Sequence, residues 1–299
     1  YALTRRLFGR GAGLLACALV AVNPTLLAHG RLVNNDVYTT LAVAGALLAS
    51  AMLLERVTWG RLGLAAAAAA LLLLGKFSWL AVVPALALMG IVSVVRRGQL
   101  RVELRGFGRP NTQLGKPRPL ARDSFGRRVA VLGGLSVLLA LVGWLSIWSC
   151  YGWRYSAFRG ADRDMAMFVT IPDPNRPAPQ TRQQAWETLL CEADGQPQRG
   201  MIPALIGFAR RHELLPEAYL YGLAYTRRHT AGRMPAYLNG EIYQGGRAAY
   251  FPIAYALKTP LATLGVLLAG VAALVFRKTA VGRDPTLLVG ALGFGVVFW

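Results

Sequence analysis

Charged side chains are scarce in this chain: only 16% of its 299 residues are Asp, Glu, Lys or Arg, whereas 55% are hydrophobic. A soluble domain of this length would expose far more charge, so the composition indicates a polytopic membrane protein. Acidic residues are the rarer sign, with 14 Asp and Glu against 33 Lys and Arg. Because no nucleic-acid-binding module accompanies this positive charge, we assign it to membrane topology and to contact with anionic lipid, and we expect no nucleic-acid partner.

Potential metal ligands are also few. The three histidines show no metal-ligand spacing, and the sequence contains no phosphate-binding glycine loop of the nucleotide type. Three cysteines do not form a disulfide framework, although Cys150 and Cys191 could pair if their segment faces an oxidising compartment. We therefore expect no metal site and no cofactor, with a divalent cation left open as the alternative.

The sequence contains seven apolar runs, most of which approach the roughly 20 residues needed to cross a bilayer, while 62–75 is short. They cover about 12–28, 36–54, 62–75, 78–95, 129–148, 256–276 and 285–299. These runs predict an all-α polytopic membrane protein, in which the alanine-rich run 65–70 is a face for close helix packing. The chain starts without Met and ends inside an apolar run, so we interpret it as a fragment of a longer protein.

Basic residues follow alternate connections between these runs, as cytoplasmic loops do. Segment 96–128 holds ten Lys and Arg against two acidic residues, whereas 149–255 holds twelve Arg against nine acidic residues. We therefore predict three regions. Residues 1–148 form about five spans with the cytoplasmic basic loop 96–128, residues 149–255 form an extracytoplasmic loop, and residues 256–299 return to the membrane.

The long segment 149–255 is expected to be mainly helical. Its proline-rich part, 172–179, is typical of an extended chain, and helices are predicted after Thr181, over 201–211 and over 216–228. Two interpretations fit the apolar residues near the last helix, a surface in the lipid headgroup zone or the core of a small helical domain. These residues are Leu214, Leu215, Tyr219, Leu220, Leu223 and Tyr225. We find no convincing alternation of the kind that indicates strands.

A polar cluster, His29 to Asp36, separates the first two apolar runs, where charged groups are costly and mark candidate functional sites. The predicted topology places Arg31, Lys76 and Lys258 at the external ends of three spans. Cationic side chains there suit a phosphate held at the membrane surface by a lipid tail, although each alone could simply snorkel to water. Asp36 has three interpretations: a helix cap, an ion-pair partner of Arg31, or a functional carboxylate.

The order of these residues resembles a known family. Residues 24–36 fit the pattern P-x-x-x-A-H-x-R-x-V-x-x-D of family 39-type glycosyltransferases with the GT-C fold, which include protein O-mannosyltransferases and aminoarabinose lipid A transferases. Residues 72–78 are similar to their L-x-K-F/Y-S turn. Residues 215–222, 237–241 and 250–260 resemble a bacterial subgroup of phospholipid-carrier-dependent glycosyltransferases.

The resemblance implies a GT-C-type transmembrane helix bundle with a large, mainly helical extracytoplasmic loop. It also implies inverting transfer of a sugar from a polyprenyl-phosphate donor to a protein or lipid acceptor, in contact with membrane lipid. Arg31 would contact the donor phosphate, with Lys76 and Lys258 as further cations, and Asp36 would shape the site or hold Arg31. The expected site-lining residues are His29, Asn34, Asn35, Glu241 and Tyr243, the last two being surface loop residues in the alternative interpretation.

The family's catalytic base is an acidic residue that we expect before residue 1, which leaves Asp36 as a possible carboxylate near the motif. We expect an integral protein of the bacterial cytoplasmic membrane, with its active site on the periplasmic or outer face. One alternative is a transporter or flippase for a lipid-linked or anionic solute, which would place charges near the bilayer midplane. Another is a membrane scaffold, in which Arg31, Lys76 and Asp36 would lie apart.

Overall fold

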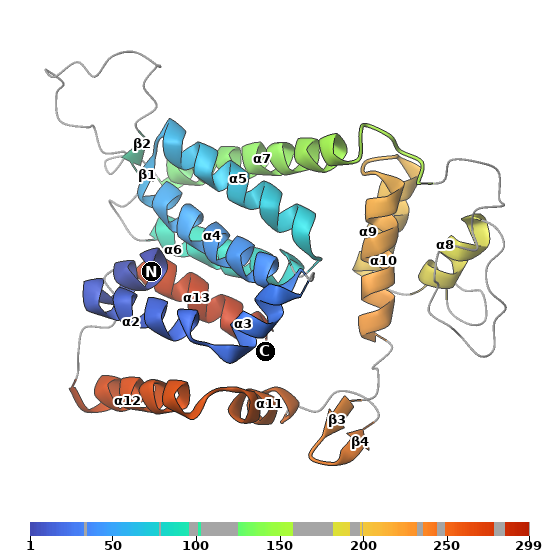
Figure 1. The fold of residues 1–299 in the computed structure, drawn as a ribbon. Coiled ribbons are helices and arrows are strands. Elements are labelled where there is room, and N and C mark those ends of the chain that lie inside the picture. Colours follow the sequence, from blue (N-terminus) through green and yellow to red (C-terminus); the bar gives the residue numbers. More distant parts are fainter. Residues whose placement is uncertain are drawn as a thin grey trace, which may run out of the picture. The chain divides into compact units, whose positions relative to one another are not determined.

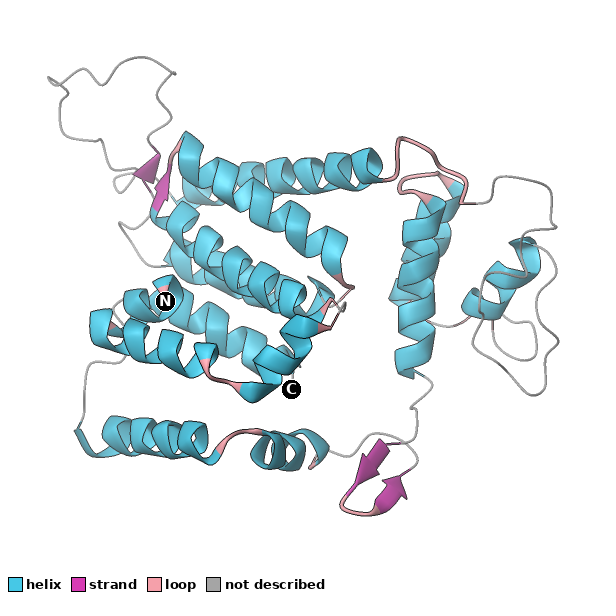
Figure 2. Ribbon diagram, in the orientation of Figure 1, coloured by secondary structure: helices cyan, strands magenta, loops and turns pink. Residues whose placement is uncertain are grey.

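The structure is a computed structural model that describes residues 1–32, 35–77, 79–95, 101–102, 125–157, 182–191, 198, 200–231, 236–243, 249–277 and 285–298 (Figure 1). Helices dominate this described part, and the strands in it are short (Figure 2). The helical architecture confirms the predicted class, an all-α membrane protein. Several predictions fall outside the described residues: Asn34, Thr181, the proline-rich stretch 172–179 and most of the basic loop 96–128.

The chain divides into two compact units, one formed by Tyr1–Gly143 with Phe251–Trp299 and the other by Trp144–Tyr250. The predicted regions 1–148, 149–255 and 256–299 concern membrane topology, and they stay predictions.

The first unit combines helices from both ends of the chain. They are α1 (Ala2–Phe8), α2 (Arg10–Ala21), α3 (Pro24–Arg31), α4 (Asp36–Glu55), α5 (Trp59–Gly75), α6 (Trp79–Val95), most of α7 (Phe125–Cys150), most of α11 (Tyr250–Lys258), α12 (Leu261–Arg277) and α13 (Pro285–Phe298). The most extensive packing joins α13 to α6 and α4 to α5. Ala46 of α4 and Ala65 and Ala68 of α5 are buried in this core, which confirms the packing role of the alanine-rich run.

Helices α4 and α7 are long and apolar enough to cross a membrane, and α11 with the start of α12 qualifies as one broken span bent by 113°. Two predicted runs are interrupted at proline. Run 12–28 splits because Asn23 caps α3, its side chain accepting a bond from the Leu26 N–H at 3.1 Å, and Pro24 takes the first helical position. Run 256–276 splits at Pro260. Proline cannot donate to the preceding turn, so it begins a new helix more readily than it continues one.

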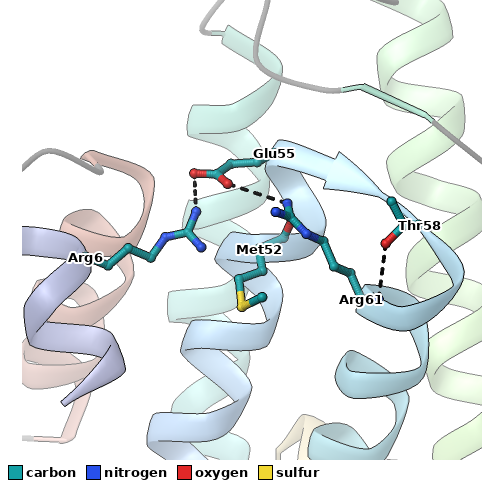
Figure 3. Close-up of polar contacts among 5 residues, drawn as sticks. All are labelled: Arg6, Met52, Glu55, Thr58 and Arg61. Carbon is teal, nitrogen blue, oxygen red and sulfur yellow. Dashed lines mark hydrogen bonds and ion pairs between the residues drawn. The ribbon is translucent and has the colours of Figure 1, made fainter. Parts of the chain in front are cut away.

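Basic residues gather at the Glu55 end of α4. Arg6 of α1 and Arg61 of α5 both form ion pairs with the Glu55 carboxylate, the second with 3.5 Å between Nη1 and Oε2 (Figure 3). Asp36 begins the same 20-residue helix, so it lies about 30 Å away along the axis. That separation matches the hydrocarbon core of a bilayer. Which of the two ends faces the cytoplasm stays a prediction.

Two predicted cytoplasmic connections also meet in the structure. Strand β1 (Arg56–Val57) pairs in parallel with β2 (Arg101–Val102). Nearby in sequence, Arg128 at the start of α7 donates a hydrogen bond of 2.7 Å to the carbonyl oxygen of Val94 at the end of α6. The first contact joins the connection after α4 to the basic segment between α6 and α7, and the second joins the two helices at the ends of that segment.

The second unit contains α8 (Arg182–Leu190), α9 (Met201–Arg211), α10 (Glu217–Ala231) and a hairpin of β3 (Ala236–Leu238) and β4 (Glu241–Tyr243). Its core takes apolar residues from all three helices: Ala185, Trp186, Leu189, Ile206, Leu220, Tyr221 and Ala224. Tyr219 and Leu220 are only 4% and 1% exposed. The prediction that Tyr219 and Leu220 face the lipid headgroups is therefore wrong, because these side chains pack inward, as the alternative of a small helical domain with its own core predicts.

The hairpin is an element that periodicity did not predict. Its turn residues, Asn239 and Gly240, have positive φ of 52° and 88°. Such values are what a type I′ turn requires, and an Asn-Gly pair favours it. Each strand has only three residues, which is too short for an alternating pattern to show.

Candidate functional site

The candidate site lies where the start of α4 meets the end of α5. The Nζ atom of Lys76 donates to Oδ1 of Asp36 at 2.9 Å. Both side chains are about half exposed, at 53% for Lys76 and 51% for Asp36. The pair is therefore accessible to a ligand while each charge holds the other in place.

Close helix packing brings these two residues together. The hydroxyl group of Tyr38, the third residue of α4, donates to the Leu71 carbonyl oxygen on α5 at 2.7 Å. The Tyr38 ring also lies against Gly75, where a Cβ atom would stand 2.9 Å from Cδ1 of the ring. Glycine thus permits the approach that brings Lys76, the next residue, to Asp36.

Two further residues of the polar cluster come from α3, which packs on α4. His29 lies close enough to interact electrostatically with the Asp36 carboxylate. Arg31 is the last residue of α3, and its side chain is exposed. The structure therefore brings His29, Asp36 and Lys76 together and leaves the Arg31 guanidinium open to solvent or ligand within the same short stretch.

The partner of Asp36 differs from the sequence-based interpretations. The ion pair that the structure gives Asp36 is with Lys76 and not with Arg31. Asp36 is also not the helix cap, because Asn35 occupies that position without a side-chain cap bond, and Asp36 is the first helical residue. A carboxylate in the first turn still complements the helix dipole. Asn35 is exposed beside it, and the role predicted for it in lining the site stays a prediction.

The other predicted residues lie on other elements. Lys258 is the exposed last residue of α11. Glu241 and Tyr243 belong to β4 in the second unit, where the Tyr243 hydroxyl donates to the Glu241 carboxylate. Their roles in donor or acceptor binding stay predictions. In the part of the chain that the structure describes, no three His, Cys, Asp or Glu residues group as metal ligands, and Cys17, Cys150 and Cys191 are free thiols.

Sequence reasoning missed Tyr38 and Gly75, the residues that build the junction. A signal was available, because glycine directly before a basic residue at a helix end permits a close approach to another chain segment. The tyrosine that fills this space is not predictable from spacing alone.

A second polar cluster, in the second unit, is structural. Glu217 is fully buried, and its carboxylate accepts bonds from the Trp186 indole N–H at 2.9 Å and from the Ala157 backbone N–H at 3.1 Å. The Arg210 guanidinium lies over the Trp186 ring, 4.7 Å from its centroid. In the same core, burial and then the neighbouring Tyr225 raise the pKa of Tyr221, so its phenol stays protonated. These groups join the helices rather than offer an open site.

Comparison with known proteins bears on the first unit. Residues 1–104 match the family model of dolichyl-phosphate-mannose-protein mannosyltransferase. No curated protein and no solved structure matches the chain significantly. The matched segment includes the stretches 24–36 and 72–78, whereas 215–222, 237–241 and 250–260 lie beyond it. Over its first third the chain is therefore similar to the dolichyl-phosphate-mannose-protein mannosyltransferases, and the Asp36–Lys76 pair falls within that similarity.

Proposed function

We propose that the protein is an integral membrane glycosyltransferase that transfers a sugar from a polyprenyl-phosphate donor to a protein or lipid acceptor. In this proposal the reaction takes place on the outer face of a bacterial cytoplasmic membrane. The observation that carries it is the Lys76–Asp36 ion pair at one end of a membrane-length helix, inside the segment that matches the mannosyltransferase family and that also holds the exposed Arg31.

The position of these charges fits a donor anchored by a lipid tail. Polyprenyl chains stay in the bilayer, so their phosphate lies at the depth of a helix end. Arg31 is exposed there, and its planar guanidinium can bind two phosphate oxygens at once. Lys76 supplies a second, compact positive charge where it pairs with Asp36, the last residue of the polar stretch.

The chemistry needs these cations most at the moment of bond cleavage. The acceptor oxygen forms a bond to the anomeric carbon while the bond from that carbon to the phosphate oxygen breaks. The electron pair passes to the phosphate, which leaves with one more negative charge. Arg31 and Lys76 would stabilise that developing charge, because positioned cations act on it without reorganisation.

Asp36 acts in this proposal as a positioning residue for Lys76, since its Oδ1 atom already accepts from the Lys76 ammonium. The acceptor hydroxyl proton passes to a carboxylate base, as the family resemblance implies. Lys258, His29, Asn34 and Asn35 are proposed to line the donor site, and Glu241 with Tyr243 the entrance for the acceptor.

The location of the charges favours this function over a transporter. A transporter for an anionic solute would need charged or unwound segments near the bilayer midplane. Asp36 instead lies at the start of α4, and Lys76 lies just after the end of α5. A scaffold would not require the two residues to meet.

The decisive experiment measures sugar transfer in membranes that contain the complete protein. Polyprenyl-phosphate hexoses and pentoses carrying a radiolabel are supplied, and label in protein and lipid fractions is counted. Replacing Arg31→Ala should lower transfer at least about tenfold, because a hydrogen bond to a charged group contributes about 1.5–3 kcal/mol. Lys76→Ala should act in the same direction.

The matched control is Arg10→Ala, which removes an exposed arginine from the start of α2 and should leave transfer unchanged. Wild-type turnover in both the Arg31 and Lys76 variants would remove the donor-site assignment. If the wild-type protein transferred no sugar but moved lipid-linked sugar across reconstituted vesicles, the transporter would replace the transferase.

A further inference from the structure

Helix α9 carries an apolar stripe that the core of its own unit does not cover. Met201, Leu205 and Phe208 are 75%, 57% and 47% exposed. Their spacing of four and then three residues places them along one face of the helix. On the opposite face Pro203 and Ile206 are buried, and Ile206 packs into the core of the second unit. The helix therefore has two apolar faces, one buried in its own unit and one exposed.

The chain just after α9 is held to the end of a membrane span. The carbonyl oxygen of Leu214 accepts bonds from two indole N–H groups, that of Trp144 at 2.6 Å and that of Trp148 at 3.2 Å. Both tryptophans belong to the last turns of α7, one of the two helices that qualify as spans. Trp148 also stacks on Trp153, with 6.2 Å between the ring centroids.

Tryptophans at the end of a span lie at the level of the lipid headgroups, with the ring in the apolar zone and the N–H toward polar groups. Leu214 therefore lies at headgroup depth, and α9 ends only three residues earlier, at Arg211. An amphipathic helix at this depth lies along the membrane plane.

The charges at the end of α9 suit the same location. Arg211 is exposed in the last turn, whereas Arg210 lies over the Trp186 ring inside the unit. His212 follows and contacts the Phe208 ring, with 4.3 Å between centroids. A basic residue beside an exposed apolar stripe is typical of a helix that binds anionic lipid headgroups.

We propose that α9 lies in the headgroup region of the bilayer that α7 crosses, with Met201, Leu205 and Phe208 inserted toward the acyl chains. The occupant of this surface is the phospholipid leaflet itself, and Arg211 favours an anionic headgroup. In this proposal the second unit contacts the membrane at two points, the tryptophans of α7 and the apolar stripe of α9. The inference does not depend on the proposed transferase activity.

The test uses photo-crosslinking in the complete protein, reconstituted into nanodiscs of phosphatidylcholine with or without phosphatidylglycerol. The photoreactive residue p-benzoylphenylalanine replaces Leu205 in one variant, Phe208 in a second and Glu187, an exposed polar residue of α8, in the control. After irradiation, mass spectrometry counts lipid adducts on the peptide that carries the label. Leu205 and Phe208 should give several-fold more lipid adduct than Glu187.

The preference for anionic lipid is tested by combining Arg211→Ala with the photoreactive residue at position 208. In nanodiscs that contain phosphatidylglycerol, the share of this lipid among the adducts should fall. Adducts at Leu205 and Phe208 no more frequent than at Glu187, or adducts to protein instead of lipid, would overturn the proposal. Because all labelled positions are exposed, the variants should keep the fold, and protease protection of α8 and α10 verifies this. The crosslinking test does not measure sugar transfer. A negative crosslinking result therefore leaves the proposed function intact, and a negative transfer assay leaves the membrane contact of α9 intact.

Discussion

The ring of Tyr38 lies against the backbone of Gly75, so a Cβ atom at residue 75 would stand 2.9 Å from the ring carbon Cδ1 and closer still to Cε1. This contact joins the start of α4 to the end of α5. Tyr38 follows Asp36 by two residues, and Gly75 directly precedes Lys76. The geometry of the candidate site therefore depends on a side chain and a glycine that carry no charge.

Replacing Gly75→Ala should separate the two helix ends. The added methyl group meets a rigid aromatic ring, and such overpacking costs about 1–3 kcal/mol. Thermal unfolding of the purified protein should show lower stability, and sugar transfer should fall with it. Gly63→Ala on the same helix is the control, because no atom lies within 4 Å of its Cβ position. That change should stabilise the helix by up to about 1 kcal/mol, and equal effects at both positions would contradict the contact.

The Asp36–Lys76 pair should matter more for transfer than for stability. Ion pairs between solvent-exposed groups contribute about 0–1 kcal/mol, and these side chains are about half exposed. A double-mutant cycle with Asp36→Asn and Lys76→Ala should therefore give a small coupling in unfolding experiments. In transfer assays the double variant should be no worse than Lys76→Ala alone, since Asp36 acts through Lys76. Additive losses in transfer would mean that Asp36 has a separate role in the reaction.

Glu217→Gln should weaken the second unit. One amide oxygen can still accept from Trp186, but the amide nitrogen then faces the Ala157 N–H, and two donors meet in a buried place. An unsatisfied buried donor costs about 1–3 kcal/mol. Hydrogen exchange of peptides from α8 and α10 should accelerate. Glu187→Gln, on the exposed side of α8, should leave exchange unchanged, and fast exchange in both variants would argue against the buried contact.

Gly290→Ala should disturb the packing of α13 on α6. A Cβ atom there would stand 2.6 Å from Cγ of Met89, a fully buried side chain. The expected loss is about 1–3 kcal/mol, less if the Met89 chain turns aside. Gly90→Ala lies next to Met89 on α6 with no atom within 4 Å of its Cβ position, so thermal unfolding should show no loss for it. A stabilised Gly290 variant would mean that the helices are not in close contact.

Much of the secondary structure was predictable from local signals. Hydropathy predicted α4 and α7 nearly to their ends, since an apolar run of membrane length has few alternatives to a helix. The same signal overran Pro24 and Pro260, because an average over a window does not register one residue that removes a backbone N–H. The hairpin at Asn239 and Gly240 escaped for the opposite reason, since its signal lies in two residues and not in a pattern.

The site was only partly predictable. Spacing and resemblance selected Arg31, Asp36 and Lys76 as residues of one polar face. For Asp36 they offered a helix cap, an ion pair with the nearby Arg31 or a functional carboxylate, and they did not predict its pairing with Lys76. In the second unit, the apolar pattern around Tyr219 and Leu220 fits a helix packed in a core and equally a helix on a membrane surface, and the structure shows that both residues are buried. Periodicity describes one helix at a time, so it cannot tell which neighbour covers a face.

The amino-acid sequence by itself determined that this is a membrane protein of helices, with a polar stretch between two apolar runs, because hydration cost depends on composition and order along the chain. Only the tertiary structure decided that Lys76, 40 residues away, is the partner of Asp36, and that α9 rather than α10 turns an apolar face outward. Such pairings depend on how closely two helices approach, which here is set by the fit of Tyr38 against Gly75.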